Sequence, residues 1–63
     1  METQTSLTAD IGYELAACVR VGICTGSQAK RAYQRVLDKP ADFVGMSVTD
    51  AADLALDLVR VAA

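Results

Sequence analysis

Hydrophobic side chains recur with the period of an α-helix in three segments of this 63-residue chain. The clearest is residues 26–38, whose apolar positions are spaced by three and four residues: Ala29, Ala32, Tyr33, Val36 and Leu37. That spacing places one apolar stripe along a helix. Thr25 and Gln28 have the spacing of a capping box at its start, and Pro40 disfavours helical backbone just after its end. The sequence therefore predicts a helix over residues 26–38.

A first helix is predicted over residues 9–22. Its apolar side contains Ile11, Leu15, Cys18, Val19, Gly22 and Ile23, whereas Tyr13 projects to the opposite side. Thr8 or Asp10 is the expected N-cap, and the polar residues 1–7 are expected to form a flexible leader. The small residues of this segment, Gly12, Ala16 and Ala17, would allow another helix to approach closely.

A third helix is predicted over residues 48–62, with Ser47 as its N-cap and Asp50 at the third helical position. Asp50, Asp53 and Asp57 form an acidic stripe, and apolar residues fill the rest of the circumference. That apolar arc is wider than a single packing surface requires. We therefore expect self-association through Leu54, Leu58 and Val61.

The connection between the second and third helices has apolar content of its own. Phe43 is the only phenylalanine of the chain, and it lies between Pro40 and Gly45. A short extra turn near residues 41–45 would press Phe43 onto the core. The predicted fold is all-α, a compact three-helix domain over residues 8–63.

The short length bears on stability. A chain of this size buries only about 60% of the surface that its unfolded form exposes, and a core so small rarely supplies more than roughly 3–5 kcal/mol. A second subunit is one way to add buried surface, so we expect a homodimer.

Composition and charge make several classes of function improbable. The chain is 52% hydrophobic with a net charge of −2 and no histidine, so the usual general base of nucleophilic catalysis is missing. Cys18 and Cys24 fit no common zinc spacing, and on one continuous helix they would lie too far apart for a disulfide, so we expect free buried thiols. No membrane span, secretory signal, cofactor, metal site or small-molecule substrate is expected, and the expected location is the cytoplasm.

The second helix carries a basic cluster with polar residues among it. The candidate partner-binding residues are Gln28, Lys30, Arg31, Gln34, Arg35 and Lys39. Three interpretations stay open. The cluster is a solvated face or pairs with the acidic stripe, it binds an acidic protein, or it contacts a nucleic-acid backbone.

Residues 14–38 resemble a helix-turn-helix motif, with Gly22 and Gly26 in the turn. The resemblance implies that the second helix enters the major groove of DNA and presents Ser27, Gln28, Lys30 and Arg31 to base edges, with Gln34 and Arg35 deeper or on phosphates. With Gly22 as the turn glycine, however, Gln28 and Arg31 fall at positions that the motif buries.

These observations favour a small non-enzymatic regulator, adaptor or inhibitor that acts by protein–protein binding as a homodimer. The alternative is a compact helix-turn-helix DNA-binding protein that uses residues 26–38 as its recognition helix.

Overall fold

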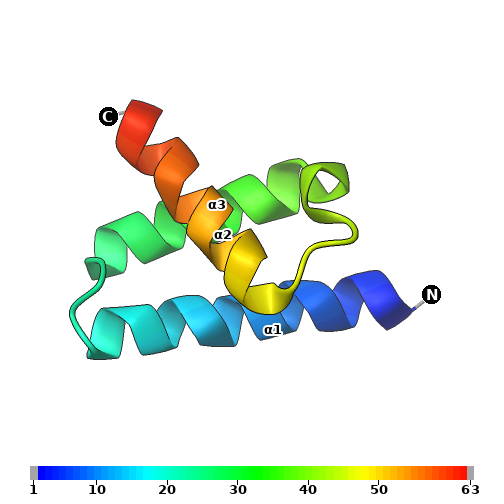
Figure 1. Cartoon of the computed structure of the whole chain (residues 1–63), viewed down its shortest axis with the longest axis horizontal. Helices are drawn as coiled ribbons and strands as arrows, with labels where there is room; N and C mark the ends of the chain where they lie inside the picture. Colours follow the sequence, from blue (N-terminus) through cyan, green and yellow to red (C-terminus); the bar gives the residue numbers. More distant parts are fainter. Residues whose placement is uncertain (1, 63) are drawn as a thin grey trace.

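Three helices cross one another in the computed structural model of the chain, which describes the backbone of residues 2–62 and the side chains of residues 7–60. The helices are α1 (Glu2–Arg20), α2 (Gly26–Asp38) and α3 (Val48–Ala62), and one turn of 3-10 helix, η1 (Pro40–Phe43), precedes α3. α1 and α2 run in nearly opposite directions, and α3 crosses in front of them (Figure 1). Each helix contacts the other two. The predicted all-α three-helix fold is confirmed.

The start of α1 differs from the prediction. The helix begins at Glu2 instead of residue 9, so Thr8 and Asp10 lie inside it and neither is its N-cap. Leu7 is half-buried and packs against the core. Because Leu7 lies one turn before Ile11, it extends the apolar stripe and gives the earlier residues a reason to continue the helix.

The end of α1 is a Schellman motif around Gly22. Gly22 has a φ of 85°, a conformation that costs glycine little. The Ile23 amide donates to the Cys18 carbonyl at 2.9 Å, and the Gly22 amide donates to the Val19 carbonyl at 3.1 Å. These two bonds satisfy carbonyls that the helix end would otherwise leave unpaired. The helix therefore ends at Arg20, two residues before the predicted end.

Side-chain caps begin the other two helices, as predicted. The Thr25 amide donates to Gln28 Oε1 at 3.0 Å, and the Gln28 amide donates to Thr25 Oγ1 at 3.1 Å. At α3 the Asp50 amide donates to Ser47 Oγ at 3.1 Å. α2 ends at Asp38, before Pro40, which opens η1. Caps of this kind each contribute about 1 kcal/mol.

The core combines a few large side chains with many small ones. Its largest fully buried members are Phe43, Ile11, Leu15, Leu56 and Val36. Phe43 has no exposed surface, as expected for the residue that η1 presses inward. The remaining core members are small: Cys18, Cys24, Ala32, Ala51, Ala52 and Ala55.

Small residues also set the contact between α1 and α2. A Cβ added to Gly12 would lie 3.0 Å from Cε1 of Tyr33, so the absence of a side chain at Gly12 leaves room for the half-buried tyrosine ring. The principal extents of the domain are 32 × 23 × 15 Å. Each of α1 and α2 keeps one side exposed, because three helices alone do not surround one another. Over the described residues, no helix has both the length and the apolar character needed to cross a membrane.

Candidate functional site

A shallow depression runs along the solvent side of α2, and four side chains line it: Ser27, Lys30, Arg31 and Gln34. They are spaced by three and four residues, so they share one face of the helix, which we call the α2 basic face. The depression has a volume of about 340 Å³, near the lower limit for ligand pockets. Because one helix alone provides its lining, the depression is open to solvent.

The charges of the α2 basic face are free of internal partners. Lys30 and Arg31 are exposed, and neither forms an ion pair with another described side chain. The first turn of α2 contains no acidic residue. The partial positive charge of the helix N-terminus therefore adds to the two cations. This face attracts anionic groups.

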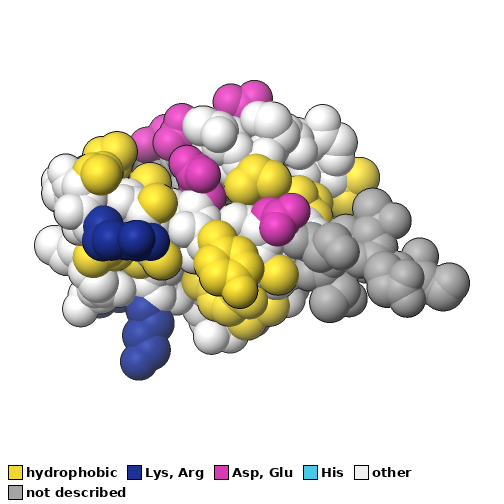
Figure 2. All heavy atoms as spheres, turned by 90° about the horizontal axis from the view of Figure 1, so that it is seen from below, with side chains coloured by type: hydrophobic (Ala, Val, Ile, Leu, Met, Phe, Trp, Pro, Cys, Tyr) yellow, Lys and Arg dark blue, Asp and Glu magenta, His cyan; other side chains and the backbone are white. Residues whose placement is uncertain are grey.

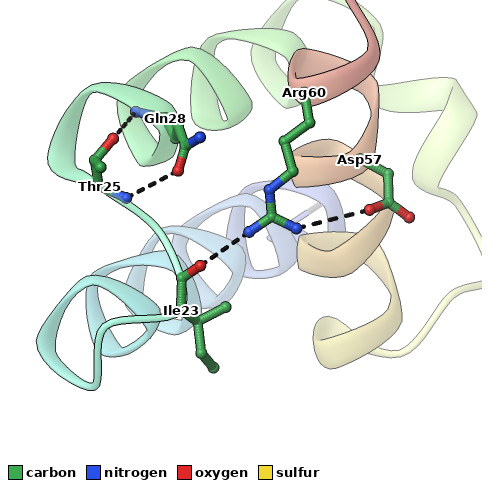
Figure 3. Close-up of polar contacts among 5 residues, drawn as sticks. All are labelled: Ile23, Thr25, Gln28, Asp57 and Arg60. Carbon is green, nitrogen blue, oxygen red and sulfur yellow. Dashed lines mark hydrogen bonds and ion pairs between the residues drawn. The ribbon is translucent and has the colours of Figure 1, made fainter.

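The other predicted partner-binding residues have different environments. Gln28 is engaged in the capping box (Figure 3). Arg35 is half-buried, and its Nη2 lies 3.8 Å from Oδ2 of Asp42. Its Nε is buried without a hydrogen-bond partner among the described residues. Lys39 is exposed at the C-terminal end of α2. The structure thus separates Lys30, Arg31 and Gln34, which share one face, from Gln28 and Arg35, which serve the fold.

The acidic stripe of α3 is solvated. Asp50, Asp53 and Asp57 are exposed, and among the described side chains their one ion pair joins Asp57 Oδ1 to Arg60 Nη1 at 3.9 Å. Within residues 7–60 no ion pair joins α2 to α3. The suggested pairing of the basic cluster with this stripe is therefore not seen, and Arg35 pairs with η1 instead. The domain separates its charges, with a basic face on α2 and an acidic one on α3.

Arg60 has a role that sequence reasoning missed. Its Nη2 donates a hydrogen bond of 2.9 Å to the carbonyl oxygen of Ile23, so α3 is tied to the turn between α1 and α2 (Figure 3). The two residues are 37 positions apart. No local pattern marks such a contact. It holds the start of α2, and with it the α2 basic face, relative to the other helices.

The residues expected to mediate self-association lie on α3. Leu54 and Leu58 are half-buried and pack against the core of their own chain. The side chain of Val61 lies outside the described residues. Much of the wide apolar arc of α3 is thus covered by α1 and α2, because Ala51, Ala52, Ala55 and Leu56 are buried as well.

The two cysteines are free and buried, as expected. The premise of one continuous helix does not hold, because α1 ends at Arg20 and Cys24 follows the turn. Burial raises the pKa of the Cys18 thiol, and the neighbouring Cys24, Glu14 and Asp53 raise it further. A thiol with a raised pKa is a poor nucleophile. Over the part of the chain that the structure describes, no group of three or more cysteine and acidic side chains is placed to hold a metal ion.

Comparison of this chain with models of protein families, with curated proteins and with solved structures found no match.

Proposed function

We propose that this chain is a small binding module, acting as a regulator, adaptor or inhibitor, that takes an acidic segment of another protein on the α2 basic face. The observation that carries the proposal is the pair of exposed cations, Lys30 and Arg31, which have no partner among the described side chains. Arginine binds carboxylates in a bidentate manner, and lysine adds a mobile point charge. Gln34, one turn further along, offers an amide for hydrogen bonds to a partner backbone.

The size of the face fits a short segment. α2 has 13 residues, so it is about 20 Å long at 1.5 Å per residue. A helix or strand of a partner that lies across this length meets both cations and Gln34. Electrostatic attraction of this kind raises the rate of association and selects among partners, and it depends on salt.

A nucleic-acid backbone is the second candidate, and the fold supports it less. The helices of a helix-turn-helix cross at roughly 90–120°, whereas α1 and α2 run in nearly opposite directions (Figure 1). The exposed cations on α2 and at its C-cap are Lys30, Arg31 and Lys39, in a chain of net charge −2. That number would neutralise roughly three phosphates, fewer than the 6–10 contacts typical of strong binders.

Fluorescence anisotropy with two labelled probes tests the proposal. One probe is a peptide of alternating glutamate and serine residues, and the other is a random 20-base-pair DNA duplex. We expect the peptide to bind at low salt, and the Lys30→Glu/Arg31→Glu variant to lose this binding. Both residues are exposed, so circular dichroism should show an unchanged helix content.

The single variant Arg31→Glu should weaken peptide binding, and its matched control is Arg20→Glu, which makes the same charge change at an exposed residue of α1 and should leave peptide binding unchanged. Tighter binding of the duplex than of the peptide would favour the nucleic-acid candidate. If neither probe binds at low salt, or if Arg20→Glu weakens peptide binding as much as the α2 variant does, the α2 basic face is not the binding site.

A further inference from the structure

A second surface, the solvent side of α1, is apolar where the α2 basic face is charged. Tyr13 lies at the centre of this surface and is 76% exposed. Ala9, Ala16 and Arg20 lie on the same side of α1 and are exposed as well. The intervals between these four residues are four, three and four positions, the spacing of helices that pair along a seam. Asp10 is exposed at the edge of the same side. We call these five residues the α1 outer face.

Figure 2 views the molecule from the α1 side. Hydrophobic side chains reach the surface in the middle and at the end near the α1–α2 turn, acidic side chains gather along one edge, and basic ones lie at the turn end. Single exposed apolar residues are ordinary on a protein surface. The alignment of apolar residues along one helix is what marks this face.

The charges of the α1 outer face are arranged so that two copies of the face have opposite charges where they meet. Asp10 and Arg20 are ten residues apart, which corresponds to about 15 Å along a helix. Neither forms an ion pair with another described side chain. If a second α1 lies antiparallel across the face, with the two-fold axis crossing it midway along the helix between residues 10 and 20, each Arg20 meets Asp10 of the partner subunit. Two-fold symmetry makes that contact twice.

The shape of the face suits the same arrangement. Ala9 and Ala16 carry only methyl groups, so two helices approach closely where they meet, and each Tyr13 ring covers the small side chains of the other helix. Val21 and Ile23, which follow Arg20 in the turn, are exposed as well. They are held in place by the Schellman motif and by the bond from Arg60 to the Ile23 carbonyl. A surface fixed in advance loses little entropy on binding.

We propose that the α1 outer face binds a second copy of this chain, with the two α1 helices antiparallel. The contact spans residues 9–20 of each copy, about 18 Å of helix. A strip of that length and one helix wide buries roughly 400–500 Å² per copy, less than the approximately 800 Å² per partner of stable complexes. The dimer is therefore a weak one, and its contact uses no residue of the α2 basic face. This surface differs from the α3 residues to which the sequence first assigned self-association.

Sedimentation equilibrium between 5 and 500 µM tests the proposal. The wild-type chain is expected to shift from monomer to dimer over this range. Tyr13→Glu should abolish the shift, because it introduces a charge at the centre of each face. Val44→Glu is the matched control, since Val44 is a similarly exposed hydrophobic residue (61%) that belongs to the connection between η1 and α3 instead of α1. Neither substitution should alter helix content.

Charge reversal tests the antiparallel register. Arg20→Asp places like charges opposite each other at both ends of the contact, and it should weaken the dimer about tenfold. Asp10→Arg should do the same, and the double reversal Asp10→Arg/Arg20→Asp should restore the wild-type dissociation constant. A wild-type chain that stays monomeric at 500 µM overturns the proposal. A dimer that is insensitive to Tyr13→Glu, or single reversals that the double reversal does not rescue, overturns it as well.

Discussion

Replacing Arg60 with methionine should lower the stability of the domain by about 1 kcal/mol. Methionine keeps an unbranched apolar stem but removes the guanidinium that donates to the Ile23 carbonyl at 2.9 Å. A hydrogen bond from a charged group contributes roughly 1.5–3 kcal/mol, and we take less than this because the Arg60 side chain is 41% exposed, so water replaces part of the lost bond. The positive charge near the C-terminus of α3 adds a few tenths of a kcal/mol through the helix dipole, about 0.3 at an exposed site.

Two further variants separate these contributions. Arg60→Lys keeps the charge near the helix end, although it lacks the planar guanidinium, and it should recover only the dipole part. Asp57→Asn removes the ion pair to Arg60, whose atoms are 3.9 Å apart and whose aspartate side chain is 70% exposed. An ion pair so exposed contributes little, about 0–0.5 kcal/mol.

Thermal and urea unfolding followed by circular dichroism measure the difference. For a domain of this size a loss of 1 kcal/mol corresponds to a Tm shift of roughly 4–8 °C. The Tm of Arg60→Met should therefore be lower than that of the wild type by about that amount. The urea midpoint should fall with an unchanged m-value, because the surface exposed on unfolding stays the same. If Asp57→Asn lowers Tm as much as Arg60→Met does, the bond to the Ile23 carbonyl contributes nothing and the reasoning is refuted.

Three other predictions concern the core. Phe43→Ala should lower the free energy of unfolding by about 3–5 kcal/mol, which is comparable to the whole stability expected of a core this small. Near-UV and far-UV circular dichroism should then show a largely unfolded chain. A cooperative transition near the wild-type Tm would contradict the burial of Phe43. In the Tyr33→Leu variant, Gly12→Ala should raise stability by up to about 1 kcal/mol, because alanine favours the helix more than glycine does. In the wild type the same change should stabilise less or destabilise, because the new methyl group meets the Tyr33 ring. Equal effects in urea unfolding of the two backgrounds would exclude that contact. Burial raises the pKa of Cys18, so the neutral thiol contributes stability that is complete below the ordinary thiol pKa of about 8.5 and is lost as the pH rises through the higher value of the folded state. Urea midpoints between pH 7 and pH 10 should therefore fall more steeply for the wild type than for Cys18→Ala, and parallel slopes would argue against this linkage.

Local signals in the sequence predicted the local structure. The Thr25–Gln28 spacing and Ser47 locate the starts of α2 and α3, because a cap depends on residues within one turn of each other. Pro40 ends α2 for an equally local reason. Phe43 was expected in the core because no other phenylalanine was available to fill it.

The features that the sequence did not predict depend on contacts between elements. α1 begins earlier than the polar character of residues 1–7 predicts, because Leu7 is in phase with Ile11 and packs against the core. The bond from Arg60 to the turn and the pairing of Arg35 with Asp42 need the third dimension to be seen. How much of the apolar arc of α3 is covered by α1 and α2 depends on how closely the buried alanines let the helices approach, and the spacing along one helix does not show that.

For the candidate site, the sequence identified a basic cluster on α2 but could not divide it. Lys30 and Arg31 project to solvent, whereas Arg35 contacts η1, and this difference follows from the path of the chain after Pro40. The α1 outer face was recognisable from the exposed position of Tyr13, but its freedom from other elements is a property of the assembled fold.

The alanines buried on α3 bear on how this protein can change. Ala51, Ala52 and Ala55 are at most 1% exposed, and a larger side chain at any of them forces the helices apart at a cost of typically 1–3 kcal/mol. Shortening one removes only a methyl group, so most of the harmful substitutions at these positions are enlargements. Random mutation should therefore damage this helix mainly by crowding, and variants that tolerate a valine there should carry a compensating reduction in a neighbouring core residue.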